Sequence, residues 1–231
     1  PRPGHEKSMN KLILIAAGAA LVMAAAYTIF MPDYVWRQKL TIEVETPQGI
    51  KSGSGVVEVR KYKSEGPLIF PEARGVSSKT VGEAAFVEVA PGRYLFALLQ
   101  GAGALAQNTY NVSGKMEKIA TYMDAMQGLR AVPNQHYPLL VTFTDINNPS
   151  SVKKIDPDNL AATFSDSVHL RRITLQITNE PVTRGRVEKL LGWLGEVWPN
   201  QLDGRRFETI EAKNRFANSL NPGSFSTEIN R

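Results

Sequence analysis

The chain has 231 residues, a length that fits one globular domain or two small ones. Hydrophobic residues make up 42% and charged residues 21%, which excludes a disordered chain and a protein with several membrane spans. The sequence contains no cysteine, so disulfides, thiolate metal sites and cysteine nucleophiles are excluded. The net charge of +5 is not concentrated in a basic stripe, and no nucleic-acid reading motif occurs, so we expect no nucleic-acid partner.

Residues 12–31 form an apolar run without a single charge, LILIAAGAALVMAAAYTIFM. As a helix, this run spans about 30 Å, the thickness of the hydrocarbon core of a bilayer. A buried helix of this length in a water-soluble domain normally carries polar residues on the side that meets water. The sequence therefore predicts a transmembrane helix at residues 12–31, preceded by a basic tail at residues 1–11 and followed by a juxtamembrane linker at residues 32–38.

The same run also fits a cleaved secretory signal, with a basic start, an apolar core and a small-residue cleavage site at Ala24-Ala25-Ala26. A retained signal anchor is favoured, because Pro32 ends a run of full spanning length and Tyr34 and Trp36 lie where interfacial aromatic residues are found. The basic tail predicts a cytoplasmic N-terminus. We therefore expect a single-pass protein of the bacterial inner membrane with a periplasmic domain and with lipid contacts through residues 12–31.

From Lys39 onward, apolar residues recur at every second position, which is the pattern of half-buried strands. Strands are expected at residues 40–45, 57–62, 84–89 and 93–99. A turn at Ala90-Pro91-Gly92 joins the last two strands, and the polar residues 74–81 are expected to form a loop. Four strands with short turns need a second layer over their apolar faces, so the sequence predicts a sandwich-like, mainly antiparallel β domain.

The segment Pro91-Gly92-Arg93-Tyr94 resembles a motif of prealbumin-like and carboxypeptidase-regulatory-like β-sandwich modules. In these modules, a strand pair is followed by a strand that begins with Pro-Gly-x-Tyr. The resemblance covers residues 39–99. It implies a module for adhesion, spacing or binding, and it brings no catalytic residues with it.

In the second half of the chain, helical and strand patterns follow one another. Residues 115–127 carry a stripe of Met and Ile at helical spacing, interpreted as core filling rather than as a binding groove. A strand at 139–143, a short helix from Asp156 to Phe164, a strand at 170–178 and an amphipathic helix at 187–198 are expected next. A turn at Asp203-Gly204 precedes an extended segment at residues 206–210, and residues 216–231 are expected to form a flexible C-terminal tail.

Three segments of this half resemble a family of bacterial proteins to which no activity is assigned. They are LVTFTDIN at residues 140–147, DPDNLAA at residues 156–162, and residues 172–183 with RITL and TNEPVT. The resemblance extends back through residues 38–60 and 93–99. It implies one folding unit and no mechanism, so we expect a single β-rich α+β domain at residues 39–215 with two or three short helices.

Two glycine-containing segments partly match known functional motifs, a dinucleotide-binding loop and a nucleophile elbow. Gly101-Ala102-Gly103-Ala104-Leu105-Ala106 has the spacing of a dinucleotide-binding loop, which requires a following helix and a second parallel strand with an acidic residue. Polar residues 108–111 interrupt any helix there, so a flexible loop is favoured. Gly53-Ser54-Gly55 is too short for a nucleophile elbow.

The histidines are His5, His136 and His169, and none belongs to a recognisable catalytic motif. Ordinary surface histidines are the favoured interpretation. A hydrolase that uses His136 or His169 with a serine or a carboxylate assembled by the fold remains an alternative.

Two segments rich in carboxylate and amide oxygens could together bind calcium. They are Asp145-Ile146-Asn147-Asn148 and Asp156-Pro157-Asp158-Asn159. A loop counted from Asp145 fails the EF-hand pattern, because Pro149 and Ser150 occupy positions that require a ligand and a glycine. Carboxylates that form turns and cap helices explain both segments more simply. We expect no catalytic, metal-binding or cofactor-binding residues and no cofactor.

The leading hypothesis is a single-pass envelope protein whose exported β-rich domain acts as a structural or binding module. One alternative is the exported hydrolase described above. Another is an accessory subunit of a membrane complex, in which the alanine-rich helix at residues 12–31 contacts a protein partner.

Overall fold

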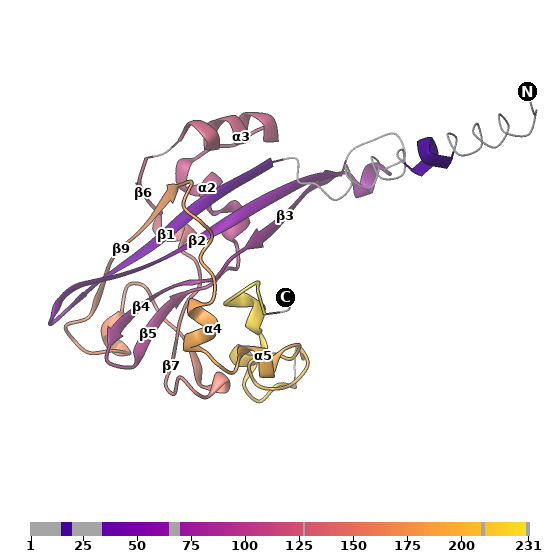
Figure 1. Cartoon of the computed structure of the whole chain (residues 1–231). Helices are drawn as coiled ribbons and strands as arrows, with labels where there is room; N and C mark the ends of the chain where they lie inside the picture. Colours follow the sequence, from indigo (N-terminus) through magenta and orange to yellow (C-terminus); the bar gives the residue numbers. More distant parts are fainter. Residues whose placement is uncertain (1–14, 20–33, 65–69, 127, 209–210, 230–231) are drawn as a thin grey trace, which may run out of the picture. The chain divides into compact units, whose positions relative to one another are not determined.

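The structure, a computed structural model, describes residues 15–19, 34–64, 70–126, 128–208 and 211–229 (Figure 1). The chain divides into two units, one made of residues 1–33 and 62–77 and the other of residues 34–61 and 78–231. In the first unit, the described part holds the short helix at residues 15–19, the 3₁₀ turn η1 (Pro71–Ala73), the end of one strand and the start of another.

The expected anchor at residues 12–31 lies outside the described residues except for residues 15–19, which are helical and exposed. Across the described ranges, we find no helix with both the length and the apolar character needed to cross a membrane. His5 and the basic tail at residues 1–11 also lie outside the described residues.

The second unit is built around two sheets. The first sheet has the strand order β3-β2-β1-β9-β6, and the second has the order β4-β5-β7-β8. The strands of the first sheet are β1 (Tyr34–Thr46), β2 (Gly49–Ser64), β3 (Gly75–Val81), β6 (Arg130–Ala131) and β9 (His169–Ile177). Those of the second are β4 (Ala85–Ala90), β5 (Arg93–Ala97), β7 (Leu140–Phe143) and β8 (Val152–Lys154). Antiparallel pairing joins β1 to β2 and to β9, and β9 to β6. In the second sheet, it joins β5 to β4 and to β7, and β7 to β8. The prediction of a β-rich, sandwich-like α+β fold is confirmed.

The alternating sequence of β1 determines which of its side chains enter the core. Trp36, Ile42 and Val44 are buried, whereas Arg37 lies on the opposite face and pairs with Glu58 of β2 at 3.1 Å. Successive strand residues point to opposite faces, so this alternation fixes the register of β1 against both neighbours.

Gly53 and Gly55 of β2 lie where the second sheet crosses the first. A Cβ atom at Gly53 would come within 1.8 Å of the Phe86 carbonyl oxygen, and one at Gly55 within 3.1 Å of the Ala85 nitrogen. Only glycine permits this approach of two backbones. The function of these two residues is therefore to let β4 contact β2, a role that the sequence alone did not suggest.

The second sheet is buried on both faces. One face packs against the first sheet through Val87, Leu95 and Leu140. The other contributes Phe96 and Phe143 to a second hydrophobic cluster. This arrangement explains why β7 is buried along its whole length, as a strand between two layers must be.

Short helices cover the remaining apolar surfaces (Figure 1). They are α2 (Ala102–Tyr110), α3 (Met116–Ala125), α4 (Arg186–Leu190), α5 (Leu194–Val197), α6 (Arg215–Asn218) and the 3₁₀ turns η2 (Asn134–His136), η3 (Pro149–Ser151), η4 (Leu160–Ala162) and η5 (Pro222–Ser224). Met116, Ile119 and Met123 of α3 are buried in the larger hydrophobic cluster, which confirms their interpretation as core residues.

The structure corrects two helix predictions. The expected helix at residues 187–198 is divided into α4 and α5, because the helix breaks around Gly192, a residue with low helix propensity. The helix expected from Asp156 to Phe164 is only the single turn η4, and its N-cap is Asn159 rather than Asp156.

Two segments that were expected to lack structure are ordered. Residues 75–81 form the edge strand β3, whose side chains up to Thr80 are exposed or half-exposed, so backbone pairing rather than an apolar pattern defines this strand.

The C-terminal segment differs from its prediction more strongly. Phe225 is completely buried between Phe96 and Trp193, and the Ala84 N–H donates to the Phe225 carbonyl at 2.8 Å. The expected flexible tail from residue 216 is therefore packed against β4 and β5 as far as the described residues reach. Residues 206–208 are not in a strand, and residues 209–210 lie outside the described residues.

Candidate binding pocket

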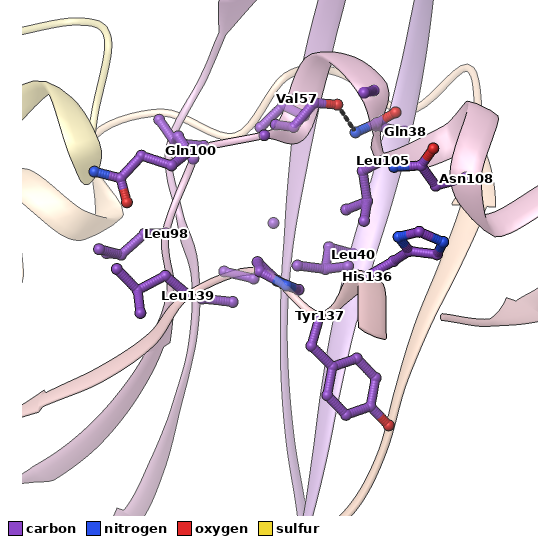
Figure 2. Close-up of a pocket in the computed structure, with 18 of the residues that line it drawn as sticks. Gln38, Leu40, Val57, Leu98, Gln100, Leu105, Asn108, His136, Tyr137 and Leu139 are labelled. Carbon is purple, nitrogen blue, oxygen red and sulfur yellow. Dashed lines mark hydrogen bonds between the residues drawn. The ribbon is translucent and has the colours of Figure 1, made fainter. Parts of the chain in front are cut away.

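A pocket of about 270 Å³ lies between the two sheets, beside the place where β4 crosses β2. Its walls come from the inner face of β1 and β2, from β4 and β5, from the first turns of α2, and from the segment around η2 (Figure 2). In Figure 2, Leu98 and Leu139 lie on one side of the cavity, and Leu105, Asn108 and His136 lie on the other.

The pocket exists because small residues occupy inward-facing positions. Ala85 of β4 is paired with Ala97 of β5, and both line the cavity. Gly55 of β2 faces the same space and has no side chain. The short side chains at these three positions leave room that larger apolar residues fill elsewhere between the sheets.

One amide, that of Gln38, lies inside this apolar space. Gln38 is 1% exposed, its Nε2 donates to the Ala102 carbonyl at 2.9 Å, and its Oε1 accepts from the Trp36 indole at 3.2 Å. Because a buried amide needs such partners, the two bonds hold the side chain in one orientation at the pocket wall. The linker predicted at residues 32–38 is instead part of β1 from Tyr34 onward, and Gln38 lies in this strand. Extending the alternation of β1 back from Leu40 would have placed it in the core.

Glu83 also lines the pocket and is buried, whereas four further polar side chains lie toward the rim. Gln100, Asn108 and Gln135 are exposed, and His136 is half-exposed. Gln100 also donates to the Ser224 hydroxyl at 3.1 Å, which connects the rim to the C-terminal segment. The pocket therefore combines a mainly apolar wall with two buried polar side chains, Gln38 and Glu83, and a polar rim, which is the usual composition of a small-molecule site.

Neither described histidine belongs to a catalytic pair. His136 lines the pocket and His169 is exposed at the start of β9, and within the described ranges neither side chain makes a hydrogen bond or ion pair. A Ser–His or carboxylate–His pair of the kind that a hydrolase requires is thus not found in the described part of the chain.

Glu83, which lines the pocket, is a buried carboxylate with an unusual environment. Its Oε2 accepts from the backbone N–H groups of Arg186 and Val187 at 3.0 Å each, at the start of α4. Its Oε1 is buried and has no hydrogen-bond partner among the described residues. Burial raises the pKa of Glu83, and the negative charge of Glu188 raises it further.

The loop that was expected to be flexible at residues 101–106 instead begins α2. Gly101 adopts a left-handed conformation with φ of 79°, and the helix starts at Ala102 directly after β5. The helix ends at Tyr110, where Asn111 is also left-handed. The next sheet partner of β5 is the antiparallel strand β7, so the βαβ unit needed for dinucleotide binding is not formed.

The oxygen-rich segments form turns and caps, as interpreted from the sequence. Asp145 Oδ1 accepts from the Asn147 N–H, and Asp156 Oδ1 accepts from the Asp158 N–H, both at 3.0 Å. Asn159 Oδ1 accepts from the Ala162 N–H and caps η4. No group of three or more potential metal ligands occurs in the ranges that the structure describes.

Comparisons of the chain with family models, with curated proteins and with solved structures give no match. The two resemblances inferred from the sequence therefore remain predictions, and the function has to be argued from the pocket itself.

Proposed function

We propose that this chain is a membrane-anchored binding protein whose β-rich domain holds a small, largely apolar ligand between its two sheets. The observation that carries this proposal is the pocket of about 270 Å³, lined by Ala85, Ala97, Leu98 and Leu105 and entered past a polar rim. Clefts of this composition are the usual binding sites for small molecules.

The size and chemistry of the pocket indicate the kind of ligand. An apolar cavity of about 150 Å³ is large enough to hold benzene, so this pocket has room for one or two ring-sized groups. Gln38 offers an amide inside the pocket, and Asn108 and His136 offer hydrogen-bonding groups at its rim. The expected ligand is therefore a compact apolar molecule with one or two polar groups.

The location that we propose is the outer face of the bacterial inner membrane. The uncharged, apolar composition of residues 12–31 supports an anchor of spanning length, and the basic residues before it support a cytoplasmic N-terminus. The domain would then bind its ligand in the periplasm.

Filling the pocket tests this function. Ala97→Leu adds apolar atoms at the floor, where the side chain of Ala97 is 1% exposed and faces Ala85 across the strand pair. We expect fluorinated ring-sized fragments to bind the wild-type chain in detergent solution, and at least tenfold weaker binding to the variant, as measured by ¹⁹F NMR titration. The melting temperature should not fall, because the added atoms enter existing space.

The matched control is Ala131→Leu, the same change on the exposed strand β6, outside the pocket. It should bind the fragments as the wild type does. A fragment panel that does not bind the wild-type chain, or that binds Ala97→Leu equally well, would contradict a ligand site between the sheets.

A further inference from the structure

A second pocket, of about 320 Å³, lies at the start of α2. It is lined by Lys61 at the inner face of β2, by Ser78 and Thr80 of β3, and by Leu99 and residues 101–104. The lining contains one basic side chain and two hydroxyl groups and no acidic residue. It shares the first turn of α2 with the candidate binding pocket. Its polar lining groups, however, are a cation and hydrogen-bond donors.

Lys61 is buried, and no counter-ion lies beside it in the described part of the chain. In the register of β2 against β1 it is paired with Tyr34, so it follows Val59 on the inward face, and it is 7% exposed. Its ammonium lies 5.8 Å from the centre of the Trp36 ring. Among the described residues it has no carboxylate partner and no hydrogen-bond acceptor. Burial lowers its pKa, which shows that its surroundings compensate the charge poorly.

The start of α2, which lines the same pocket, is a second feature that attracts anions. The N–H groups of Ala102 and Ala104 donate to the carbonyls of Leu99 and Gly101, and no side chain caps the helix. The N–H of Gly103, in the first turn, donates to no carbonyl in the described part of the chain. Such unused N–H groups and the positive end of the helix dipole attract anions.

Gly103 and Ser78 lie unusually close together. A Cβ atom at Gly103 would come within 2.3 Å of the Ser78 hydroxyl oxygen. The missing side chain therefore leaves room for the Ser78 hydroxyl directly beside the backbone of the first helical turn. Lys61, Ser78 and Gly103 line the pocket from three different elements, β2, β3 and α2.

We propose that this pocket binds a phosphate-type oxyanion, with the Lys61 ammonium, the Ser78 and Thr80 hydroxyls and the Gly103 N–H as its donors. Donors from several directions suit a tetrahedral anion, and the bound anion supplies the negative charge that buried Lys61 lacks. The anion is either free phosphate or the head of a phosphomonoester, since both present the same oxygens. This site is independent of the apolar ligand proposed above.

Calorimetric titration of the full chain in a nonionic sugar detergent tests the site. Inorganic phosphate and methyl phosphate are added separately at constant ionic strength with chloride as background. Binding of both probes indicates a site open to esters, whereas binding of inorganic phosphate alone indicates a site for the free ion, and either result supports the proposal. Absence of binding by both would overturn it.

Three variants assign the binding to these residues. Lys61→Met should weaken phosphate binding at least tenfold without lowering the melting temperature measured in the absence of phosphate, because it removes a poorly compensated buried charge. Ser78→Ala, which leaves Lys61 in place, should weaken binding severalfold. Lys79→Met removes the same charge from an exposed neighbouring position and should bind as the wild type does. Unchanged affinity in Lys61→Met and Ser78→Ala, or an equal loss in Lys79→Met, would refute the assignment.

Discussion

Glu83 connects the second sheet to the helices that cover it. One of its oxygens accepts from two backbone N–H groups at the start of α4, whereas the other is buried and has no partner among the residues that the structure describes. Removing the first contact would leave two buried donors unsatisfied. The protonated form of Glu83 suits its surroundings better than the charged form, since burial and the charge of Glu188 both raise its pKa.

This shift gives the domain a defined pH dependence. Because the pKa of Glu83 is higher in the folded chain than in the unfolded chain, its stabilising contribution is present at acidic pH and is lost as the pH rises through the folded pKa. Glu83→Gln keeps the carbonyl acceptor for α4 and cannot ionise. We expect the free energy of unfolding of the wild type, relative to this variant, to fall in denaturant titrations as the pH is raised from the ordinary carboxyl range toward neutrality. A constant difference across this range would contradict the raised pKa.

At the scale of the elements, the crossing of β4 over β2 organises the domain. Gly53→Ala places a methyl group against backbone atoms of Phe86 and Val87, which cannot move aside as a flexible side chain can. The sheets must then separate, at a cost of about 1–3 kcal/mol or more in the free energy of unfolding. Chemical denaturation measures this loss.

Gly192→Ala is the matched control for that substitution, because nothing lies within 4 Å of a Cβ atom at Gly192. Its stability should be equal to that of the wild type or slightly higher, since Gly192 lies in a turn without a positive φ and alanine reduces the conformational freedom of the unfolded chain. Equal stability of Gly53→Ala and Gly192→Ala would show that the two sheets do not touch at β2.

The elements also show what sequence patterns can and cannot predict. The β4–β5 hairpin and α3 were predicted because alternation, the Pro91-Gly92 turn and helical spacing are local signals. The edge strand β3 was missed because its partner, not its own polar sequence, makes it a strand. The burial of Phe225 depends on aromatic contacts with residues distant in the chain, which no local pattern contains.

The pocket was missed for a related reason. Ala85, Ala97 and Gly55 are unremarkable in the sequence, and they form a cavity only where register and sheet crossing bring their short side chains together. The inward position of Gln38 could have been predicted by extending the alternation of β1 from Leu40 back by two residues. The position of Lys61 could be predicted from the same alternation, but its nearness to the start of α2 could not.

In the whole molecule, the proposed anchor determines the compartment in which the domain binds its ligand. Ala20→Arg introduces a charge at the middle of residues 12–31, which costs about 2.5–3.5 kcal/mol for insertion into a bilayer. We expect the variant to be lost from the carbonate-washed membrane fraction, whereas Ala131→Arg on the domain surface remains there. Retention of Ala20→Arg in the membrane would count against the anchor.

Ligand binding between the two sheets is best tested by the position of a bound fragment. NMR spectra of the chain with ¹³C-labelled alanine methyl groups, recorded with and without a binding fragment, report that position. The methyl signals of Ala85 and Ala97, which line the pocket, should shift, whereas that of Ala217, in the opposite hydrophobic cluster, should not. Shifts at Ala217 with unchanged signals from Ala85 and Ala97 would contradict binding between the two sheets.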